Sequence, residues 1–254
     1  MRDARLPSRF DRLDALRGLA MVWMTAFHFC FDLNHFRFIA QDFYRDPFWT
    51  WQRTAIVSLF LFCAGLGQAV AHAQGLSWPR FWRRWAQVAG AALLVSAGSY
   101  LVFPNSFIYF GVLHGIALML LVARWSAGWG GWLWPLGALA LALPWLLPPW
   151  LHSMGWAELF NARALNWLGL ITRKPVTEDY VPVLPWLGVV WWGMATGRWA
   201  LTTRAHWLAG NLSTQGRALA ALGRWSLSYY LLHQPVLMGL VAAAAWLMNG
   251  TLRA

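Results

Sequence analysis

Apolar stretches follow one another along almost the whole chain, separated by short polar segments. They cover about 15–38, 53–73, 86–103, 107–125, 130–148, 183–201 and 221–247, and the one long connection is 149–182. A helix needs about 20 predominantly apolar residues to cross the hydrocarbon core of a bilayer. The pattern therefore predicts an all-α, polytopic membrane helix bundle of about seven transmembrane helices, formed by a single domain over residues 1–254.

The first stretch differs from the others because ionisable side chains interrupt it. These residues are Asp14, Arg17, His28, Asp32 and His35. At about 100° per residue they all fall on one narrow stripe of a single helix. An ionisable group in hydrocarbon costs roughly 2.5–3.5 kcal/mol on insertion scales, so the stripe has to face protein or water. The pattern indicates a working polar core; the alternative is a set of buried polar pairs that only hold helices together.

Composition supports a membrane location and argues against a nucleic-acid partner. Hydrophobic residues make up 59% of the chain and charged residues 11%, against roughly 25% charged in soluble domains. The net charge is +11, but no nucleic-acid-binding motif accompanies it. Cys30 and Cys63 lie inside apolar stretches and are interpreted as packing residues. No metal is expected.

The distribution of basic residues predicts an orientation. Arginines are more numerous at those helix ends that share a side with the N-terminus, for example Arg80, Arg83 and Arg84 before the third stretch. Cytoplasmic ends of membrane helices carry an excess of basic residues. The N-terminus is therefore expected to be cytoplasmic.

Three histidines are candidates for chemistry inside the membrane. His28, His114 and His233 fall at comparable depth in three different predicted helices, although the sequence does not say whether they meet. His28 and Asp32 are spaced i,i+4, so their side chains share a helix face. A carboxylate beside an imidazole fixes its tautomer and raises its basicity, as a general base requires. The alternative for each histidine is a hydrogen-bonding role in packing.

Arginines at the predicted cytoplasmic mouth are candidates for binding a phosphate-bearing donor. They are Arg17, Arg80, Arg83, Arg84 and Arg224. Guanidinium groups bind phosphates in a bidentate manner. Charge that only sets the topology explains these residues equally well.

Residues expected on the opposite side are candidates for binding an acceptor. Arg53 opens the second helix, and Asp179 and Trp186 lie in the segment EDYVPVLPWLG at a helix entrance. Tyr230 shares a face of the last helix with His233, next to Pro235, which usually kinks a helix. For Arg53 the alternative is an interfacial anchor, and for the segment a loop that restarts a helix.

The chain resembles the bacterial membrane proteins related to heparan-alpha-glucosaminide N-acetyltransferase, within the wider group of transmembrane acyltransferases. The matching pieces are LDALRGLAMVWM, then His28 with FDL, then FLFCAGL, IYFGVLHGIA, DYVPVLPWLGVVWWGMATG and LGRWSLSYYLLHQPVL. They follow in order over nearly the whole chain.

This resemblance implies acyl transfer across a bacterial cytoplasmic (inner) membrane by a multi-pass enzyme. Acetyl-CoA on the cytoplasmic side would supply an acetyl group to an extracytoplasmic glycan or sugar, at an amine or a hydroxyl. His28, with Asp32 as its orienting partner, would act as general base or acyl carrier. His114, Tyr230 or His233 would donate a hydrogen bond to the developing oxyanion.

Two other functions use the same polar core. A transporter of a sugar or small anion would show internal repeats, and no repeat stands out in this chain. A haem-binding electron carrier would use paired intramembrane histidines as ligands. The identity of the acceptor, the acyl chain length, direct or two-step transfer, and the oligomeric state, including a homo-oligomer, stay open.

Overall fold

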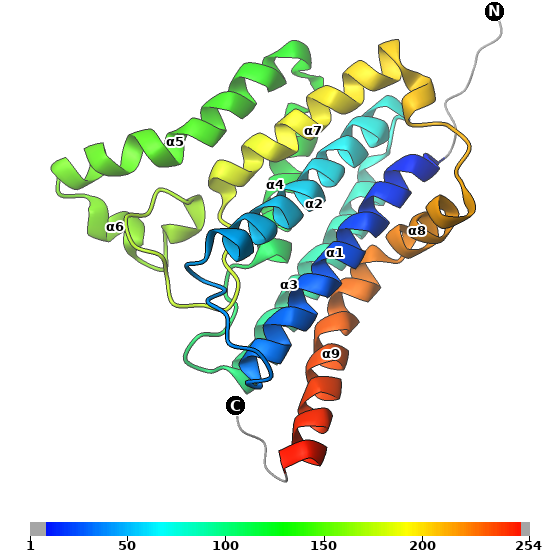
Figure 1. Cartoon of the computed structure of the whole chain (residues 1–254). Coiled ribbons are helices and arrows are strands. Elements are labelled where there is room, and N and C mark those ends of the chain that lie inside the picture. Colours follow the sequence, from blue (N-terminus) through cyan, green and yellow to red (C-terminus); the bar gives the residue numbers. More distant parts are fainter. Residues whose placement is uncertain (1–8, 250–254) are drawn as a thin grey trace, which may run out of the picture. The chain divides into compact units, whose positions relative to one another are not determined.

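The structure is a computed structural model that describes residues 9–249, and these residues are largely helical (Figure 1). The helices are α1 (Asp11–His35), α2 (Pro47–Ala73), α3 (Trp78–Val102), α4 (Val112–Trp125), α5 (Leu133–Ser153), α6 (Ala157–Asn161), α7 (Val183–Thr203), α8 (Thr214–Arg224) and α9 (Ser226–Asn249). Within residues 9–249 the extended pairing is one isolated bridge, between Phe110 and Tyr180. The predicted all-α class is confirmed.

Every predicted apolar stretch contains a helix, but not every helix is long and apolar enough to span a bilayer. Four segments of the described chain meet both conditions: Pro47–Ala73, Trp78–Val102, Gly130–Ser153 and Ser226–Met248. Helix α4 has 14 residues, short of the roughly 20 that a span needs. The structure therefore supports a membrane protein, while the count of seven spans and the cytoplasmic N-terminus stay predictions.

The structure divides the last predicted helix into two. Residues 221–247 were expected to form one helix, but α8 ends at Arg224 and α9 starts at Ser226. The Trp225 N–H donates an i→i−3 hydrogen bond to the Leu222 carbonyl, and α8 ends at this turn. Apolar residues lie on both sides of this turn, so the overall hydrophobicity of the stretch did not reveal it.

The chain divides into two compact units. The central unit comprises Arg9 and Leu61–Leu208, and the terminal unit comprises Phe10–Phe60 together with the chain from Ala209 onward. The single domain over residues 1–254 stays a prediction.

In the central unit, helices cross closely where glycines remove side chains. Helix α7 packs against α5 and α4, and α3 packs against α4. A Cβ atom on Gly65 of α2 would collide with the Val190 carbonyl oxygen of α7, and one on Gly193 would collide with the Phe62 carbonyl oxygen. Small residues at such crossings let helix backbones approach closely in membrane proteins.

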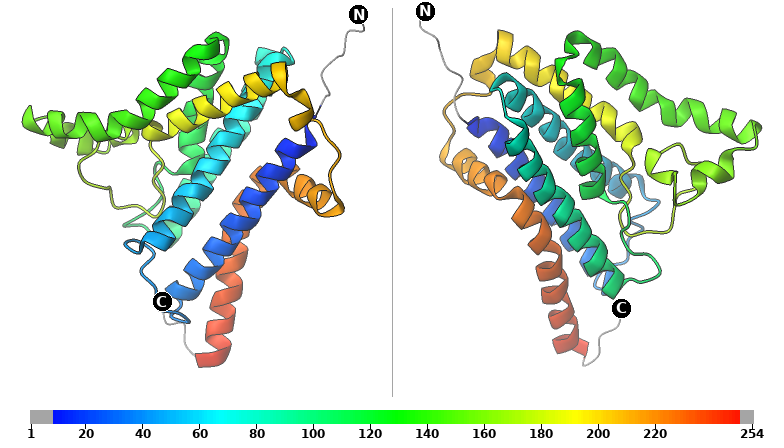
Figure 2. Two further views of the ribbon diagram at one scale, coloured as in Figure 1. Left: turned by 45° about the horizontal axis from the view of Figure 1, so that its top comes forward. Right: turned by 180° about the vertical axis from the view of Figure 1, so that it is seen from behind.

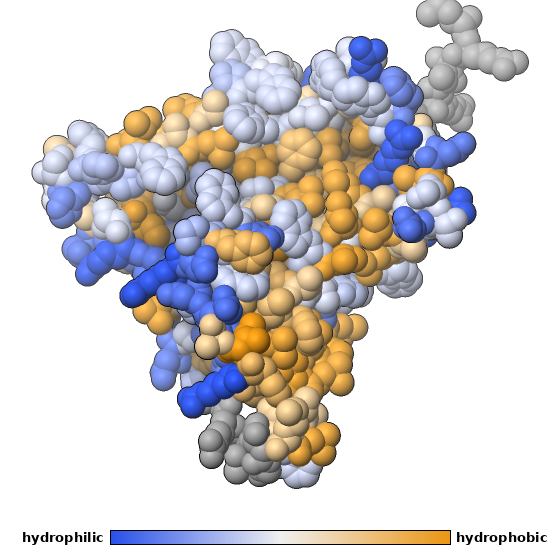
Figure 3. Space-filling model, in the orientation of Figure 1, coloured by the Kyte–Doolittle hydropathy of each residue, from blue (hydrophilic) through white to orange (hydrophobic). Residues whose placement is uncertain are grey.

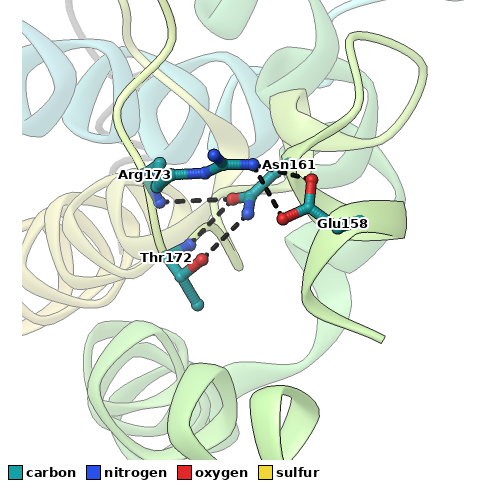
Figure 4. A network of polar contacts seen from close by, with 4 residues as sticks. All are labelled: Glu158, Asn161, Thr172 and Arg173. Carbon is teal, nitrogen blue, oxygen red and sulfur yellow. Dashed lines mark hydrogen bonds and ion pairs between the residues drawn. The ribbon is translucent and has the colours of Figure 1, made fainter. Parts of the chain in front are cut away.

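Polar contacts at the surface help to order the connection 149–182. It contains the end of α5, α6 and an irregular return segment. Arg173 Nη2 donates to both carboxylate oxygens of Glu158, at 2.7 and 2.6 Å (Figure 4). The Asn161 side chain donates from Nδ2 to Thr172 Oγ1 and accepts at Oδ1 from the Thr172 backbone N–H. Because these groups are exposed, the ion pair is worth at most about 1 kcal/mol.

In the terminal unit, α1 packs against α8 and α9, and Figure 2 shows α1 running beside α9. A Cβ atom on Gly18 would collide with the Leu219 carbonyl oxygen of α8, and one on Gly223 would collide with the Asp14 carbonyl oxygen of α1. These reciprocal contacts fix the position of α1 along α8.

The outer faces of α3 and α9 are strongly apolar and exposed. On α3 they carry Leu93, Leu94 and Leu101, and on α9 Leu240 and Leu247. The lower part of α9 is accordingly orange in Figure 3. Such contiguous exposed apolar surface is unusual for a soluble monomer and is typical of helices in contact with lipid.

The glycine contact between α1 and α8 generates a stability prediction. Gly18→Ala should lower the midpoint of thermal unfolding in detergent, because the added methyl group meets the α8 backbone; such overpacking costs typically about 1–3 kcal/mol. Gly90→Ala in α3 is the matched control, since its Cβ would meet no atom within 4 Å and alanine is favoured over glycine inside a helix. A Gly18→Ala protein as stable as the Gly90→Ala protein would contradict the packing.

Candidate functional site

The structure brings two of the three candidate histidines together in the terminal unit. His28 Nδ1 on α1 lies 2.8 Å from His233 Nε2 on α9. The two rings meet edge to edge and are nearly coplanar, with centroids 5.0 Å apart and planes inclined by 15°. His233 is buried and His28 is partly buried. The histidine pair is therefore a direct hydrogen bond between two helices, and this distance leaves no room for an iron atom between the two nitrogens.

Aromatic and backbone groups of α9 surround His233. Its Nδ1 lies 2.7 Å from the Tyr230 carbonyl oxygen. The Tyr229 ring stacks on the His233 ring at 5.8 Å with an interplanar angle of 7°. The Tyr229 hydroxyl lies 2.7 Å from Thr25 Oγ1 of α1, which ties this stack to the neighbouring helix.

Asp32 does not bond His28, contrary to the expectation that it orients that ring. The carboxylate is fully buried, and its Oδ1 accepts a hydrogen bond of 2.8 Å from Gln234 Nε2 of α9. Asp32 Oδ2 and Gln234 Oε1 have no partner among the described residues. The i,i+4 spacing places Asp32 on the right face of α1, but His28 Nδ1 is already engaged by His233.

Gln234 is the residue that sequence reasoning missed. Its side chain bonds Asp32 and also lies beside His28. It carries no charge, so a search for ionisable groups in apolar helices passes over it. The available signal was an amide side chain inside an apolar span, because such groups bond across helices in membranes.

His114 lies in the central unit, where both of its ring nitrogens are engaged. Its Nδ1 accepts from the Gly111 N–H at 3.2 Å, and its Nε2 lies 3.0 Å from Ser96 Oγ. Ser96 Oγ in turn donates to the Ile108 carbonyl at 2.6 Å. These contacts hold the start of α4, so the catalytic role expected for His114 stays a prediction while a structural role is visible.

The acceptor-binding candidates are distributed over both units. Asp179 Oδ2 accepts from the Val112 N–H at 2.7 Å and caps the start of α4. Trp186 lies in the first turn of α7, and Arg53 in the part of α2 that belongs to the terminal unit. Tyr230 is the one whose ring lies at the histidine pair, 5.7 Å from the His233 centroid.

A second polar cluster orders the loops around the start of α4. Asn166 Nδ2 donates to the Tyr109 hydroxyl at 2.8 Å, and the Tyr180 hydroxyl donates to the Asn166 carbonyl at 2.6 Å. Burial raises the pKa of both tyrosines, so their phenols stay protonated. The Arg163 guanidinium lies over the Tyr109 ring at 4.7 Å.

The donor-binding candidates divide between the units as well. Arg17 pairs with Asp14 at 3.0 Å, and Arg224 lies 3.9 Å from Asp11, so both arginines sit at the N-terminal end of α1. The other three, Arg80, Arg83 and Arg84, are exposed in the first turns of α3 in the central unit.

Comparison with known families identifies the relationship of this chain. The family model described as heparan-alpha-glucosaminide N-acetyltransferase, catalytic, matches residues 9–235. No curated protein and no solved structure matches the chain. The matched region includes both members of the histidine pair as well as Asp32 and Gln234. Since the match covers most of the sequence, the chain belongs to the heparan-alpha-glucosaminide N-acetyltransferase catalytic-domain family.

Proposed function

We propose that this chain is an acetyltransferase of a bacterial cytoplasmic membrane, which moves an acetyl group from cytoplasmic acetyl-CoA to an extracytoplasmic sugar amine or hydroxyl. The observation that carries the proposal is the imidazole of His28, held by a second imidazole between α1 and α9. It lies in a largely apolar stretch of the sequence and within the region matched by the family model. Membrane helices rarely keep such groups without a functional reason.

His28 is suited to take a proton from the acceptor. Its Nδ1 is engaged by His233, which leaves Nε2 as the ring nitrogen for the reaction, and the side chain of Gln234 lies beside the ring. In direct transfer, His28 removes the proton of the acceptor amine or hydroxyl while that atom attacks the thioester carbonyl, and CoA leaves as a thiolate. In two-step transfer, His28 attacks the carbonyl itself, and the acceptor then takes the acetyl group from the imidazole.

The arginines supply the means to hold the phosphates of the donor. Arg17 and Arg224 lie at the N-terminal end of α1, and Arg80, Arg83 and Arg84 at the start of α3. A cytoplasmic N-terminus would place all five at the compartment that contains acetyl-CoA. Their planar guanidinium groups match the geometry of phosphate oxygens.

Among the acceptor-binding candidates, the ring of Tyr230 is best placed because it lies beside His233. Asp179 already caps the start of α4, and its role in binding the acceptor is proposed on its expected location at a helix entrance. Arg53 and Trp186 are proposed on their expected location alone.

Replacing His28 tests the proposed chemistry. Purified His28→Ala protein should keep its thermal midpoint within a few degrees yet lose acetyl transfer by about 10²–10⁴-fold, the usual contribution of a general base. The assay follows the CoA thiol released from acetyl-CoA with glucosamine as the acceptor. His72→Ala, at an exposed position near the end of α2, is the matched control. If His28→Ala transfers acetyl groups at the same rate as His72→Ala, His28 is not the base or the acyl carrier.

Donor binding separates an acyltransferase from a sugar or anion transporter. Acetyl-CoA should raise the thermal midpoint of the purified protein, with about 2.7 kcal/mol of stabilisation at a hundred times its Kd. The Arg80→Gln/Arg83→Gln/Arg84→Gln triple variant should lose most of this shift. Arg173→Gln is the control, because Arg173 pairs with Glu158 instead. An unchanged midpoint of the wild-type protein with acetyl-CoA would favour the transporter.

A further inference from the structure

The Tyr230 carbonyl beside the histidine pair determines where the ring protons lie. A carbonyl oxygen only accepts hydrogen bonds. The 2.7 Å contact to His233 Nδ1 therefore requires a proton on that nitrogen. A neutral imidazole carries one N–H, so His233 Nε2 has a lone pair and accepts.

The position of the proton on His233 determines the position of the proton on His28, because the two rings share a hydrogen bond. The group that faces His233 Nε2 at 2.8 Å is His28 Nδ1, which must then be the donor. The single proton of neutral His28 is thereby held on Nδ1. Its Nε2 is left with the lone pair, which is the state that a base or a nucleophile needs.

The contacts around His233 oppose a flip of its ring, which would change these proton positions. Turning the His233 ring by 180° would present a C–H group, in place of Nδ1–H, to the Tyr230 carbonyl. The flip would also present a C–H group, in place of the Nε2 lone pair, to His28 Nδ1. The Tyr229 ring lies parallel to the His233 ring, with the centroids 5.8 Å apart. The Tyr229 hydroxyl is itself held by Thr25.

We propose that His233 is a positioning residue, which together with the Tyr230 backbone carbonyl holds His28 in the tautomer with the lone pair on Nε2. This is the task that the sequence assigned to Asp32. The inference rests on the proposed function, in which His28 is the base or the acyl carrier.

The same contact provides a path for the proton during the reaction. When Nε2 of His28 takes the proton of the acceptor amine or hydroxyl, the Nδ1 proton moves to His233 Nε2. His28 is then neutral again, and the positive charge lies on His233, whose Nδ1–H stays on the Tyr230 carbonyl. When the CoA thiolate takes the proton from His28 Nε2, the proton on His233 Nε2 returns to His28 Nδ1. The net reaction leaves both histidines unchanged.

Two substitutions of His233 separate positioning from packing. In His233→Gln the amide oxygen reaches the place of Nε2 and still accepts from His28 Nδ1, whereas His233→Asn is too short to reach it. With His233→Asn, kcat should fall about 10–100-fold, as for other groups that orient an active imidazole, while the KM for acetyl-CoA stays unchanged. His233→Gln should recover most of kcat. Wild-type kcat in His233→Asn would overturn the proposal.

A spectroscopic measurement tests the tautomer without using activity. In the ¹⁵N spectrum of histidine-labelled protein, with His28→Ala to assign the signals, His28 should show a protonated Nδ1 and an unprotonated Nε2. His233→Gln should keep this pattern, and His233→Asn should show a mixture of both tautomers. A protonated Nε2 in the wild-type protein would overturn the positioning role. If the spectra are as expected but His28→Ala is active, the tautomer assignment holds and the proposed function is rejected.

Discussion

An imidazole inside an apolar helix bundle has little water to bond with, and this constraint governs the arrangement around His28. Its Nδ1 must find a partner on a neighbouring helix, and the structure provides His233 at 2.8 Å. His233 then needs an acceptor for its own N–H, which the Tyr230 carbonyl supplies one helical turn earlier. Each group satisfies the next, because an unpaired polar group in hydrocarbon costs several kcal/mol. These two contacts leave the lone pair of His28 on Nε2, the nitrogen that the proposed chemistry requires.

Close backbone packing makes this short contact between helices possible. Gly18 and Gly223 remove the side chains that would separate α1 from α8, and α8 leads directly into α9 through the turn at Trp225. The position of α1 along α8 therefore sets the height of His28 relative to α9. The central unit uses the same device at Gly65 and Gly193. Without water to drive apolar association, close van der Waals contact between helices is a main source of such order.

The sequence predicted the helices, because hydrophobic length depends on local residues alone, while the comparable depth of the three histidines stays a prediction. It did not predict which helices are neighbours, since periodicity gives the face of a helix but not its partner. For this reason Asp32, one turn from His28 on the same helix, looked like the orienting group, while His233 and Gln234 on α9 do the bonding. His114 is a different case. Its contact to the Gly111 N–H is a local i,i+3 contact at a helix start, and that pattern was readable from the sequence.

Pairing His28 with a second imidazole instead of a carboxylate has a physical consequence. A histidine–aspartate ion pair would bring two charges into a low-dielectric region, and the cost of removing them from water often exceeds their attraction. Two neutral imidazoles joined by one hydrogen bond avoid that cost in the resting protein. Charge then develops only while a proton is in transit, and it is shared between two rings and the Tyr230 carbonyl. The nearest carboxylate, Asp32, instead accepts a hydrogen bond at Oδ1 from the neutral amide of Gln234.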